Sequence, residues 1–400
     1  MKFLRDALDK TKSHFEKGKK FEKFYYIFES IDTLMFTPKE TTHAKGVQIR
    51  DAVDMKRMMM TVIIAMIPCL LFGIWNVGQQ HFIALGQQAE FLDIILIGAM
   101  KVVPIIAVSY IVGLGIEFTF SVFRQHPINE GFLVTGMLIP LVLPATIPLW
   151  QVALATAFAV IIGKEAFGGT GMNILNVALT ARAFLYFAYP SQISGEVWTF
   201  IGDNAQAVAG FSGATPLALG ADAVANGTNM MTSMSSFGEG WYDNIYSFSN
   251  MFFGFMPGSI GETSTLMCLI GAFILIATGV GSWKIIFSVF AGAYGMGLIL
   301  NGFGANPFMD MPAHYHLVIG GLAFGAVFMA SDPVTAAQTE TGKWIYGFGI
   351  GMLTVVIRVL NPAYPEGIML AILFFNVFAP LIDFYVVKAN KKRRLQRATV

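Results

Sequence analysis

One short run of small residues in this chain ends in a hydroxyl group that could carry a covalent substituent. The run is Ser212, Gly213, Ala214 and Thr215, and Pro216 follows it. Small side chains let a bulky group approach the backbone closely, and the threonine hydroxyl is a possible anchor for an ester or a phosphoester. A threonine before proline is also an ordinary way to begin a turn. These residues alone leave both interpretations open.

A second glycine-rich stretch, residues 167–176, has groups that could hydrogen-bond a planar polar ring. It combines three glycines with the side-chain amides of Asn173 and Asn176. Such amides both donate and accept hydrogen bonds, and backbone N–H groups at the start of a helix add further donors. The alternative is a tight turn with an N-cap, which the residues fit equally well.

Charged side chains within apolar stretches are costly in a membrane and usually functional. A hard cation such as sodium is bound by oxygen atoms, and Glu130 and Asp383 suit that role. For each of them, the alternative is an interhelical ion pair or a place at the water interface. The candidates among such charges are Lys101, Glu117, Glu130, Arg182, Arg358 and Asp383.

The sequence has no recognisable catalytic or metal-binding cluster. Cys69 and Cys268 lie in apolar runs without a histidine or cysteine partner at ligand spacing, and the six histidines form no catalytic group. Neither a G-x-x-x-x-G-K loop nor a dinucleotide fingerprint after a strand is present. We therefore expect no catalytic residue, no metal ion and no nicotinamide site on this chain.

The elements that position these residues are those of an all-α membrane protein. Of 400 residues, 55% are hydrophobic and 13% are charged, whereas about 25% charged is usual in a soluble domain. The net charge of +1 gives no sign of nucleic-acid binding. Ten apolar runs are candidate transmembrane helices: 58–78, 92–120, 131–149, 150–164, 174–190, 265–281, 285–300, 316–331, 344–360 and 366–387.

The distribution of Lys and Arg predicts the orientation of these helices. Thirteen of the 26 lie in residues 1–57 and six in 388–397, so both termini are expected in the cytoplasm. Between Arg182 and Lys284 there is none. The long connection 191–264, which contains Thr215, should therefore lie on the outer face. Residues 1–57 should form an amphipathic extension on the cytoplasmic side, and 388–400 a basic tail.

A weak internal repeat suggests how the helices are arranged. Leu143-Pro-Ala-Thr146 in the first half parallels Asp332-Pro-Val-Thr335 in the second, and a basic residue, Lys164 or Arg358, follows each. Five spans per half would make 58–190 and 265–387 inverted repeats. Repeats of this kind bring broken helices together around a central pathway. Chance similarity between apolar segments rich in Gly and Pro is the alternative.

Several longer motifs together resemble a known family. They are Asn129–Thr135, Lys164–Asn173, Pro257–Thr263 and Asp332–Thr335, along with Ser212–Thr215 after the fifth span. This combination resembles the family formed by the NqrB proteins of the sodium-translocating NADH:quinone oxidoreductases and the RnfD proteins of the Rnf complexes. The resemblance covers nearly the whole chain, and the long N-terminal extension is similar to the former group.

The resemblance implies two flavins. FMN would be attached to Thr215 through a phosphoester, with Ser212, Gly213 and Ala214 completing the attachment motif. Riboflavin would be bound without a covalent bond in the membrane part, and Asn173 and Asn176 are the candidate contacts. The family tends to have proline after the second asparagine, where this chain has a valine.

It also implies a role in a larger assembly. The chain would be one of six subunits of a complex in the bacterial inner membrane, with the nicotinamide site on a partner. Electrons would pass from FMN to riboflavin and on to ubiquinone, near Glu130 and Gly131. Sodium would move outward between the repeats, using acidic residues such as Glu130 and Asp383. The fold would be similar to the inverted repeat of urea transporters.

Two other functions fit parts of the same sequence. A channel for a small solute such as urea would also use inverted repeats and broken helices, but it has no evident need of the polar connection 191–264. An Rnf-type protein, which passes electrons between ferredoxin and NAD, would share the membrane core. The N-terminal extension argues against that second alternative.

Overall fold

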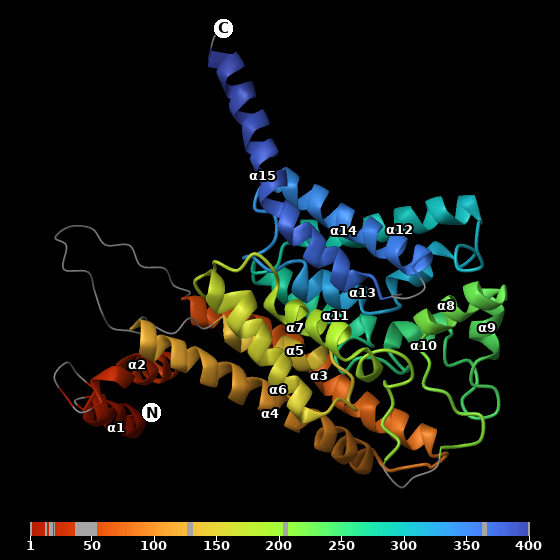
Figure 1. The fold of residues 1–400 in the computed structure, drawn as a ribbon, viewed down its shortest axis with the longest axis horizontal. Coiled ribbons are helices and arrows are strands. Elements are labelled where there is room, and N and C mark those ends of the chain that lie inside the picture. Colours follow the sequence, from red (N-terminus) through yellow and green to blue (C-terminus); the bar gives the residue numbers. More distant parts are fainter. Residues whose placement is uncertain are drawn as a thin grey trace.

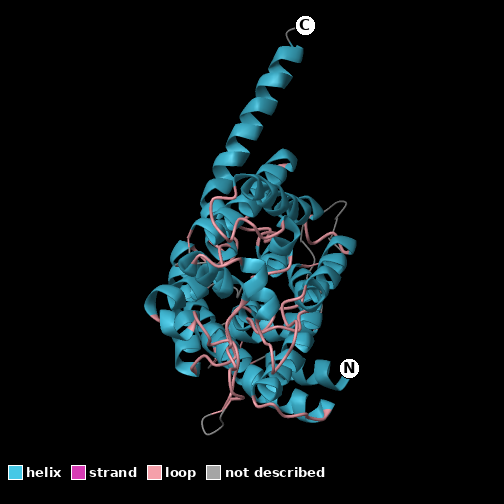
Figure 2. Ribbon diagram, turned by 90° about the vertical axis from the view of Figure 1, so that its right-hand side faces the viewer, coloured by secondary structure: helices cyan, strands magenta, loops and turns pink. Residues whose placement is uncertain are grey.

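The computed structural model describes residues 2–12, 14–15, 19, 21–36, 54–125, 131–202, 207–361 and 366–398. All regular structure in these residues is helical, and no strand occurs among them (Figure 2). The expectation of an all-α protein is thus confirmed for the described residues. The α-helices are α1 (Lys2–Lys12), α2 (Tyr25–Met35), α3 (Met55–Ala84), α4 (Phe91–Arg124), α5 (Phe132–Leu141), α6 (Leu149–Phe158), α7 (Val177–Ala188), α8 (Pro216–Asn226), α9 (Met230–Ser236), α10 (Phe248–Phe253), α11 (Thr265–Ala277), α12 (Trp283–Phe303), α13 (Leu322–Phe324), α14 (Glu340–Leu360) and α15 (Ile368–Ala398).

Shorter segments of other helix types link several of these helices. Two are π-helical, η2 (Ala159–Lys164) after α6 and η6 (Gly325–Met329) after α13. The 3₁₀ segments are η1 (Glu22–Phe24), η3 (Glu165–Phe167), η4 (Pro190–Gln192) and η5 (Ala313–Leu317). π-Helical turns occur often at functional sites, and each of these two ends just before a stretch singled out above.

In the described part of the chain, six helices are long and apolar enough to cross a membrane. They are Met55–Ala84, Phe91–Arg124, Leu149–Phe167, Trp283–Phe303, Glu340–Leu360 and Ile368–Arg397. The other four expected spans contain only shorter pieces: α5, α7 and α11 have 10, 12 and 13 residues, and 316–331 is divided among η5, α13 and η6. A single helix needs about 20 residues to cross the hydrocarbon core.

The short helix α5 ends at an irregular segment, and a distant part of the chain donates hydrogen bonds to the free carbonyl groups there. The N–H groups of Ile260 and Gly261 donate to the carbonyl oxygens of Leu143 (3.1 Å) and Leu141 (2.7 Å). A helix end has carbonyl groups without partners inside the helix. Irregular backbone at membrane depth requires such partners from other protein segments. The 257–264 segment therefore completes the end of α5.

Glycines allow the long helices to pack backbone against backbone. A Cβ atom on Gly351 of α14 would lie 2.1 Å from the Val289 carbonyl oxygen of α12, and one on Gly292 would lie 2.2 Å from that of Phe348. Helices α3 and α4 are equally close at Gly98. Small residues at such contacts are typical of helix packing in membranes, where apolar surface alone gives no driving force.

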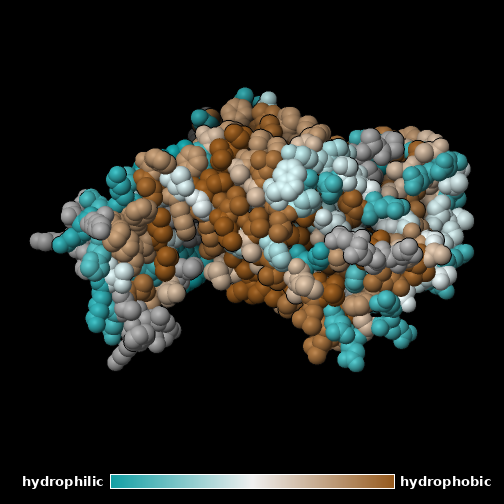
Figure 3. Space-filling view, turned by 60° about the horizontal axis from the view of Figure 1, so that its bottom comes forward, coloured by the Kyte–Doolittle hydropathy of each residue, from teal (hydrophilic) through white to brown (hydrophobic). Residues whose placement is uncertain are grey.

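The surface divides into an apolar middle and two more polar ends. Figure 3 shows hydrophobic side chains gathered over the centre and hydrophilic ones towards either end. Helices α1 and α2 lie at one end, and α8, α9 and α10 lie at the other (Figure 1). Large apolar side chains such as Ile111 and Phe273 are more than 70% exposed. The apolar middle is consistent with a protein surrounded by lipid.

Candidate functional site

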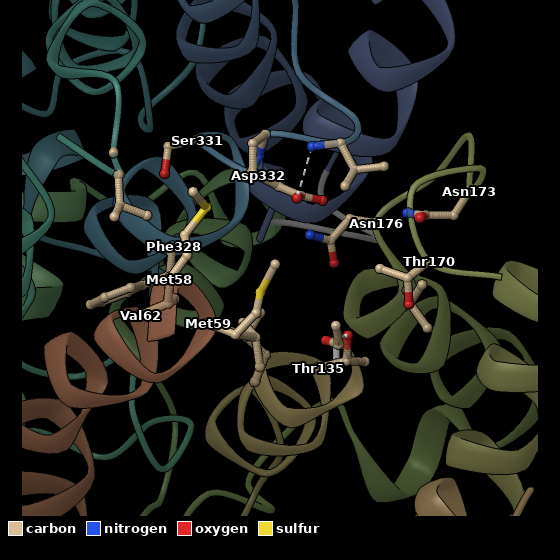
Figure 4. Close-up of a pocket in the computed structure, with 18 of the residues that line it drawn as sticks. Met58, Met59, Val62, Thr135, Thr170, Asn173, Asn176, Phe328, Ser331 and Asp332 are labelled. Carbon is tan, nitrogen blue, oxygen red and sulfur yellow. Dashed lines mark hydrogen bonds between the residues drawn. The ribbon is translucent and has the colours of Figure 1, made fainter. Parts of the chain in front are cut away.

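A pocket beside the start of α3 brings together both halves of the chain (Figure 4), and we call it the inner pocket because the sequence predicts that this end faces the cytoplasm. The first half contributes residues of α3, α5 with its N-cap, η2 and the 170–177 stretch. The second half contributes residues of α11 and η6 and of the segments that follow them. Most of the lining is apolar. The residues are Met58, Met59, Val62, Gly131, Val134, Thr135, Leu138, Lys164, Thr170, Asn173, Asn176, Val177, Leu275, Val280, Gly281, Phe328, Ser331, Asp332, Pro333 and Val334.

Three residues singled out from the sequence lie in this one pocket: Gly131, Asn173 and Asn176. Asn176 is the N-cap of α7, and its Oδ1 accepts a hydrogen bond from Leu179 N at 3.1 Å. Asn173 donates from Nδ2 to the Leu175 carbonyl at 3.0 Å. The N-cap interpretation is thus confirmed at Asn176, which also lines a cavity. The contact with a planar ring stays a prediction.

The lining of the inner pocket includes a half-buried carboxyl group, that of Asp332, which the sequence did not single out as a site residue. Asp332 accepts hydrogen bonds from Val334 N (3.1 Å) and from the hydroxyl of Thr335 (3.0 Å). Burial raises the pKa of Asp332. The Asp332-Pro-Val-Thr335 motif, the weak parallel of Leu143-Pro-Ala-Thr146, was the available signal, because it marks the break between η6 and α14 at which this carboxylate lines the pocket.

A buried ion pair lies beside the same pocket. Lys164, one of the lining residues, pairs with Glu117 of α4, and both side chains are about 4% exposed. Arg124 pairs with the adjacent Glu165 at 3.1 Å. The sequence identified Glu117 as a costly charge, and the structure gives it a partner 47 residues away.

Of the two acidic residues expected to bind sodium, the structure describes only Asp383. Glu130 lies outside the described residues. Asp383 does not line the inner pocket. Its carboxylate accepts hydrogen bonds from the backbone N–H groups of Gln338 (2.7 Å) and Thr339 (2.9 Å) and from the Thr339 hydroxyl. Asp383 thus holds the segment that begins α14.

The Ser212–Thr215 motif lies at the other end of the molecule, immediately before α8. Thr215 is the N-cap of this helix, and its Oγ1 accepts a hydrogen bond from Ala218 N at 3.3 Å. Ser212 donates from its hydroxyl to Glu196 at 2.6 Å, and its Oγ also accepts from Ala214 N. The buried Tyr246 donates to the Ala214 carbonyl. The motif is therefore held firmly on both sides of Thr215.

Thr215 borders an outer pocket with an acidic wall. Small residues form much of the remaining lining, which leaves open space beside the threonine. The residues are Trp198, Thr215, Pro216, Leu217, Met256, Pro257, Gly258, Ser259, Glu262, Thr263, Gly320, Gly321 and Glu366. A smaller adjoining cavity is also lined by Trp198, Thr215 and Glu366. No pattern in the sequence indicated that Glu262 and Glu366 meet near Thr215.

The surroundings of Thr215 fit a covalently attached flavin phosphate. An anion at the N-terminus of a helix interacts favourably with the free N–H groups and with the helix dipole, and a phosphoester on Thr215 would lie at the N-terminus of α8. Thr215 is half-buried, so its hydroxyl is reachable. The outer pocket offers small residues and the indole of Trp198 beside it. The residues present are suited to an attached planar group.

The chain is similar to known proteins along almost its whole length. A family model described as NQR2, RnfD, RnfE family matches residues 42–392. The NqrB protein of the Na(+)-translocating NADH-quinone reductase of Ectopseudomonas mendocina is 47% identical and aligns with 98% of this chain and 99% of its own length. Its counterparts from Chromohalobacter salexigens and Pseudomonas aeruginosa are 47% and 44% identical, over 98% of this chain and 96% and 99% of theirs.

Proposed function

The chain belongs to the NQR2, RnfD, RnfE family, and from this premise we propose that it is the NqrB component of a sodium-translocating NADH:quinone oxidoreductase. Identity of 44–47% along nearly the entire chain to proteins of that name carries the proposal. The partners are the other subunits of the complex, and the location is the bacterial inner membrane. The absence of a dinucleotide fingerprint from the sequence assigns the nicotinamide site to a partner.

The outer site holds FMN on Thr215 in this proposal. The position of Thr215 as N-cap of α8 supports it, because the helix N-terminus stabilises a phosphoester at that residue. Ser212 and Tyr246 fix the chain before the anchor through their hydrogen bonds. When bound, the flavin supplies reversible electron transfer, and the residues around it set its position and its contact with water.

The inner pocket holds riboflavin, and ubiquinone approaches it near Gly131 and Glu130. The amides of Asn173 and Asn176 line this pocket and can hydrogen-bond the polar edge of a flavin ring. Burial raises the pKa of Asp332, so its carboxyl group takes up a proton at a higher pH than an exposed aspartate does.

We also propose that ten membrane segments form two inverted repeats, 58–190 and 265–387, around a sodium pathway. The extension 1–57 and the tail 388–400 are cytoplasmic in this scheme, and 191–264 is on the outer face. The two repeated motifs support it, because each lies at a break: 143–146 between α5 and α6, and 332–335 between η6 and α14. Asp332 lines the inner pocket, whereas Thr146 bonds to Val197 at the start of the outer connection. Opposite locations are what inversion requires.

In-gel flavin fluorescence tests the proposed function at Thr215. The complex is expressed in a host that supplies the flavin-attaching enzyme, and the denatured polypeptide is viewed under ultraviolet light. The wild-type band should fluoresce, and Thr215→Asn should lose all covalent flavin. Asparagine is as good an N-cap as threonine, so this variant removes the anchor and keeps the cap.

Thr228→Ala is the matched control, because Thr228 is an exposed threonine of the same outer connection. Its band should fluoresce like the wild type. A dark wild-type band, or a fluorescent Thr215→Asn band, would refute the attachment of flavin to Thr215. Sodium-dependent NADH:quinone activity of the purified complex separates this function from that of an Rnf-type protein.

A further inference from the structure

A buried charge network forms the floor of the outer pocket. Arg182 of α7 donates to Glu262 at 2.8 Å and to Glu366 at 2.5 Å, and its own side chain is only 3% exposed. Glu262 precedes α11, and Glu366 precedes α15. One guanidinium group of the first half of the chain thus holds two carboxylates of the second half.

A second guanidinium group lies behind the first. Arg358 is fully buried and donates to the backbone carbonyl oxygens of His316 (2.7 Å), Ile319 (2.8 Å), Gly320 (3.0 Å) and Glu366 (3.2 Å). Two arginines and two glutamates make the network neutral when all four are ionised. The network therefore has no net charge that would outweigh a change of charge in the adjacent pocket.

The network and the attachment residue share the same space. Glu262, Glu366 and Thr215 all line the outer pocket, and Glu366 and Thr215 also line the adjoining cavity. Gly320 and Gly321 at the same wall have φ of +61° and +66°. A Cβ on Gly321 would lie 2.8 Å from the Glu262 carboxyl carbon. Glycine there lets the backbone approach the carboxylate without closing the pocket.

We propose that this floor receives the ring system of the flavin carried by Thr215, and that Arg182 is the positioning residue that fixes both carboxylates beneath it. The proposal rests on the proposed attachment of FMN to Thr215 and adds the residues that set how readily the ring accepts an electron. An electron added without a proton gives the ring one negative charge. Glu262 opposes that charge and Arg182 favours it, at low effective dielectric constant.

The sign of two redox shifts tests the proposal. The midpoint potential of the covalent flavin is measured in the purified complex by spectroelectrochemical titration, in which the electrode supplies the electrons. Glu262→Gln removes a negative charge and should raise the potential, whereas Arg182→Gln removes a positive charge and should lower it. The double variant restores the charge balance, so its potential should return towards the wild-type value, as should that of Arg182→Lys.

Glu239→Gln is the matched control. Glu239 is an exposed carboxylate of the same 191–264 connection that does not line the outer pocket. Because solvent screens it, this variant should leave the potential nearly unchanged. If the network had a purely structural role, the midpoint potentials of the two charge-removing variants would shift in the same direction or not at all. The proposal would be overturned if the midpoint potentials of Glu262→Gln and Arg182→Gln shifted in the same direction. It would also be overturned if the potential of Glu262→Gln did not shift.

Gel fluorescence distinguishes a failure of the proposed attachment to Thr215 from a failure of the proposal about the pocket floor. All variants retain Thr215, so their denatured bands should remain fluorescent. If Arg182→Gln fails to assemble because it leaves two buried carboxylates without a partner, Glu262→Gln and the double variant still decide the outcome. A dark wild-type band defeats the attachment proposal. Fluorescent bands with unchanged potentials defeat only the assignment of the floor.

Discussion

Thr215 performs a structural task that is compatible with its proposed chemical one. As N-cap of α8 it needs its Oγ1 only as a hydrogen-bond acceptor. A phosphoester would replace the hydroxyl proton and leave that oxygen in place. The turn and the anchor, which the sequence presented as alternatives, are therefore chemically compatible at this one side chain.

Asn173 should contribute to the binding of the non-covalent flavin in the inner pocket. Asn173→Ala removes one donor and acceptor from the pocket wall, at a cost of about 0.5–1.5 kcal/mol, or up to roughly tenfold in affinity. We expect less riboflavin in acid extracts of the purified variant, as measured by chromatography. Asn226→Ala, at an exposed outer site, should retain the wild-type amount. Equal riboflavin in both variants would contradict the assignment.

Asn173 and Asn176 could be placed together from the sequence because they are close along the chain. Asn173 and Asn176 lie in a single glycine-rich turn, and one turn places both at the same pocket. The outer network could not be found in this way. Arg182 meets Glu262 and Glu366 across 80 and 184 positions. Only the folded arrangement of three separate segments creates that meeting.

At the scale of the helices, the close contact between α12 and α14 depends on glycine. In Gly351→Ala, the new Cβ would lie 2.1 Å from a backbone oxygen of α12. Backbone cannot move aside cheaply, so we expect a loss of about 1–3 kcal/mol, as for other overpacked cores. Thermal denaturation of the purified complex should show a lower midpoint temperature.

Gly295 of α12 provides the matched control for this prediction. A Cβ there meets nothing within 4 Å. Gly295→Ala should therefore leave stability unchanged or raise it by up to about 1 kcal/mol, through better helix propensity. Equal destabilisation by Gly351→Ala and Gly295→Ala would show that the close α12–α14 contact does not account for the loss of stability.

The breaks within the expected spans were harder to predict than the spans themselves. The irregular segment 142–148 is nearly as apolar as the helices on either side of it. The hydropathy therefore does not fall at the break, and it predicts one continuous span over 131–149. The helix ends where it does because carbonyl groups of Leu141 and Leu143 pair with Ile260 and Gly261. This contact joins segments that no local pattern connects.

At the scale of the whole molecule, cysteine labelling can test the orientation. Ser235→Cys places a thiol on the exposed face of α9 in the outer connection, and Lys391→Cys places one on the basic end of α15. In spheroplasts, a membrane-impermeant maleimide should label the first, and it should label the second only after permeabilisation. The native Cys69 and Cys268 are buried, so background labelling should be low. Labelling of residue 391 in intact spheroplasts would overturn the scheme.

The missing Lys and Arg of the outer connection have a practical consequence for chemical analysis. Trypsin cleaves only after these residues, and none occurs between Arg182 and Lys284. A complete digest therefore leaves a single long fragment, Ala183–Lys284, that contains both Thr215 and Glu262. The charge pattern from which we predict the orientation also makes the 191–264 connection resistant to this protease. Any group bound to Thr215 would be recovered on one peptide of known mass.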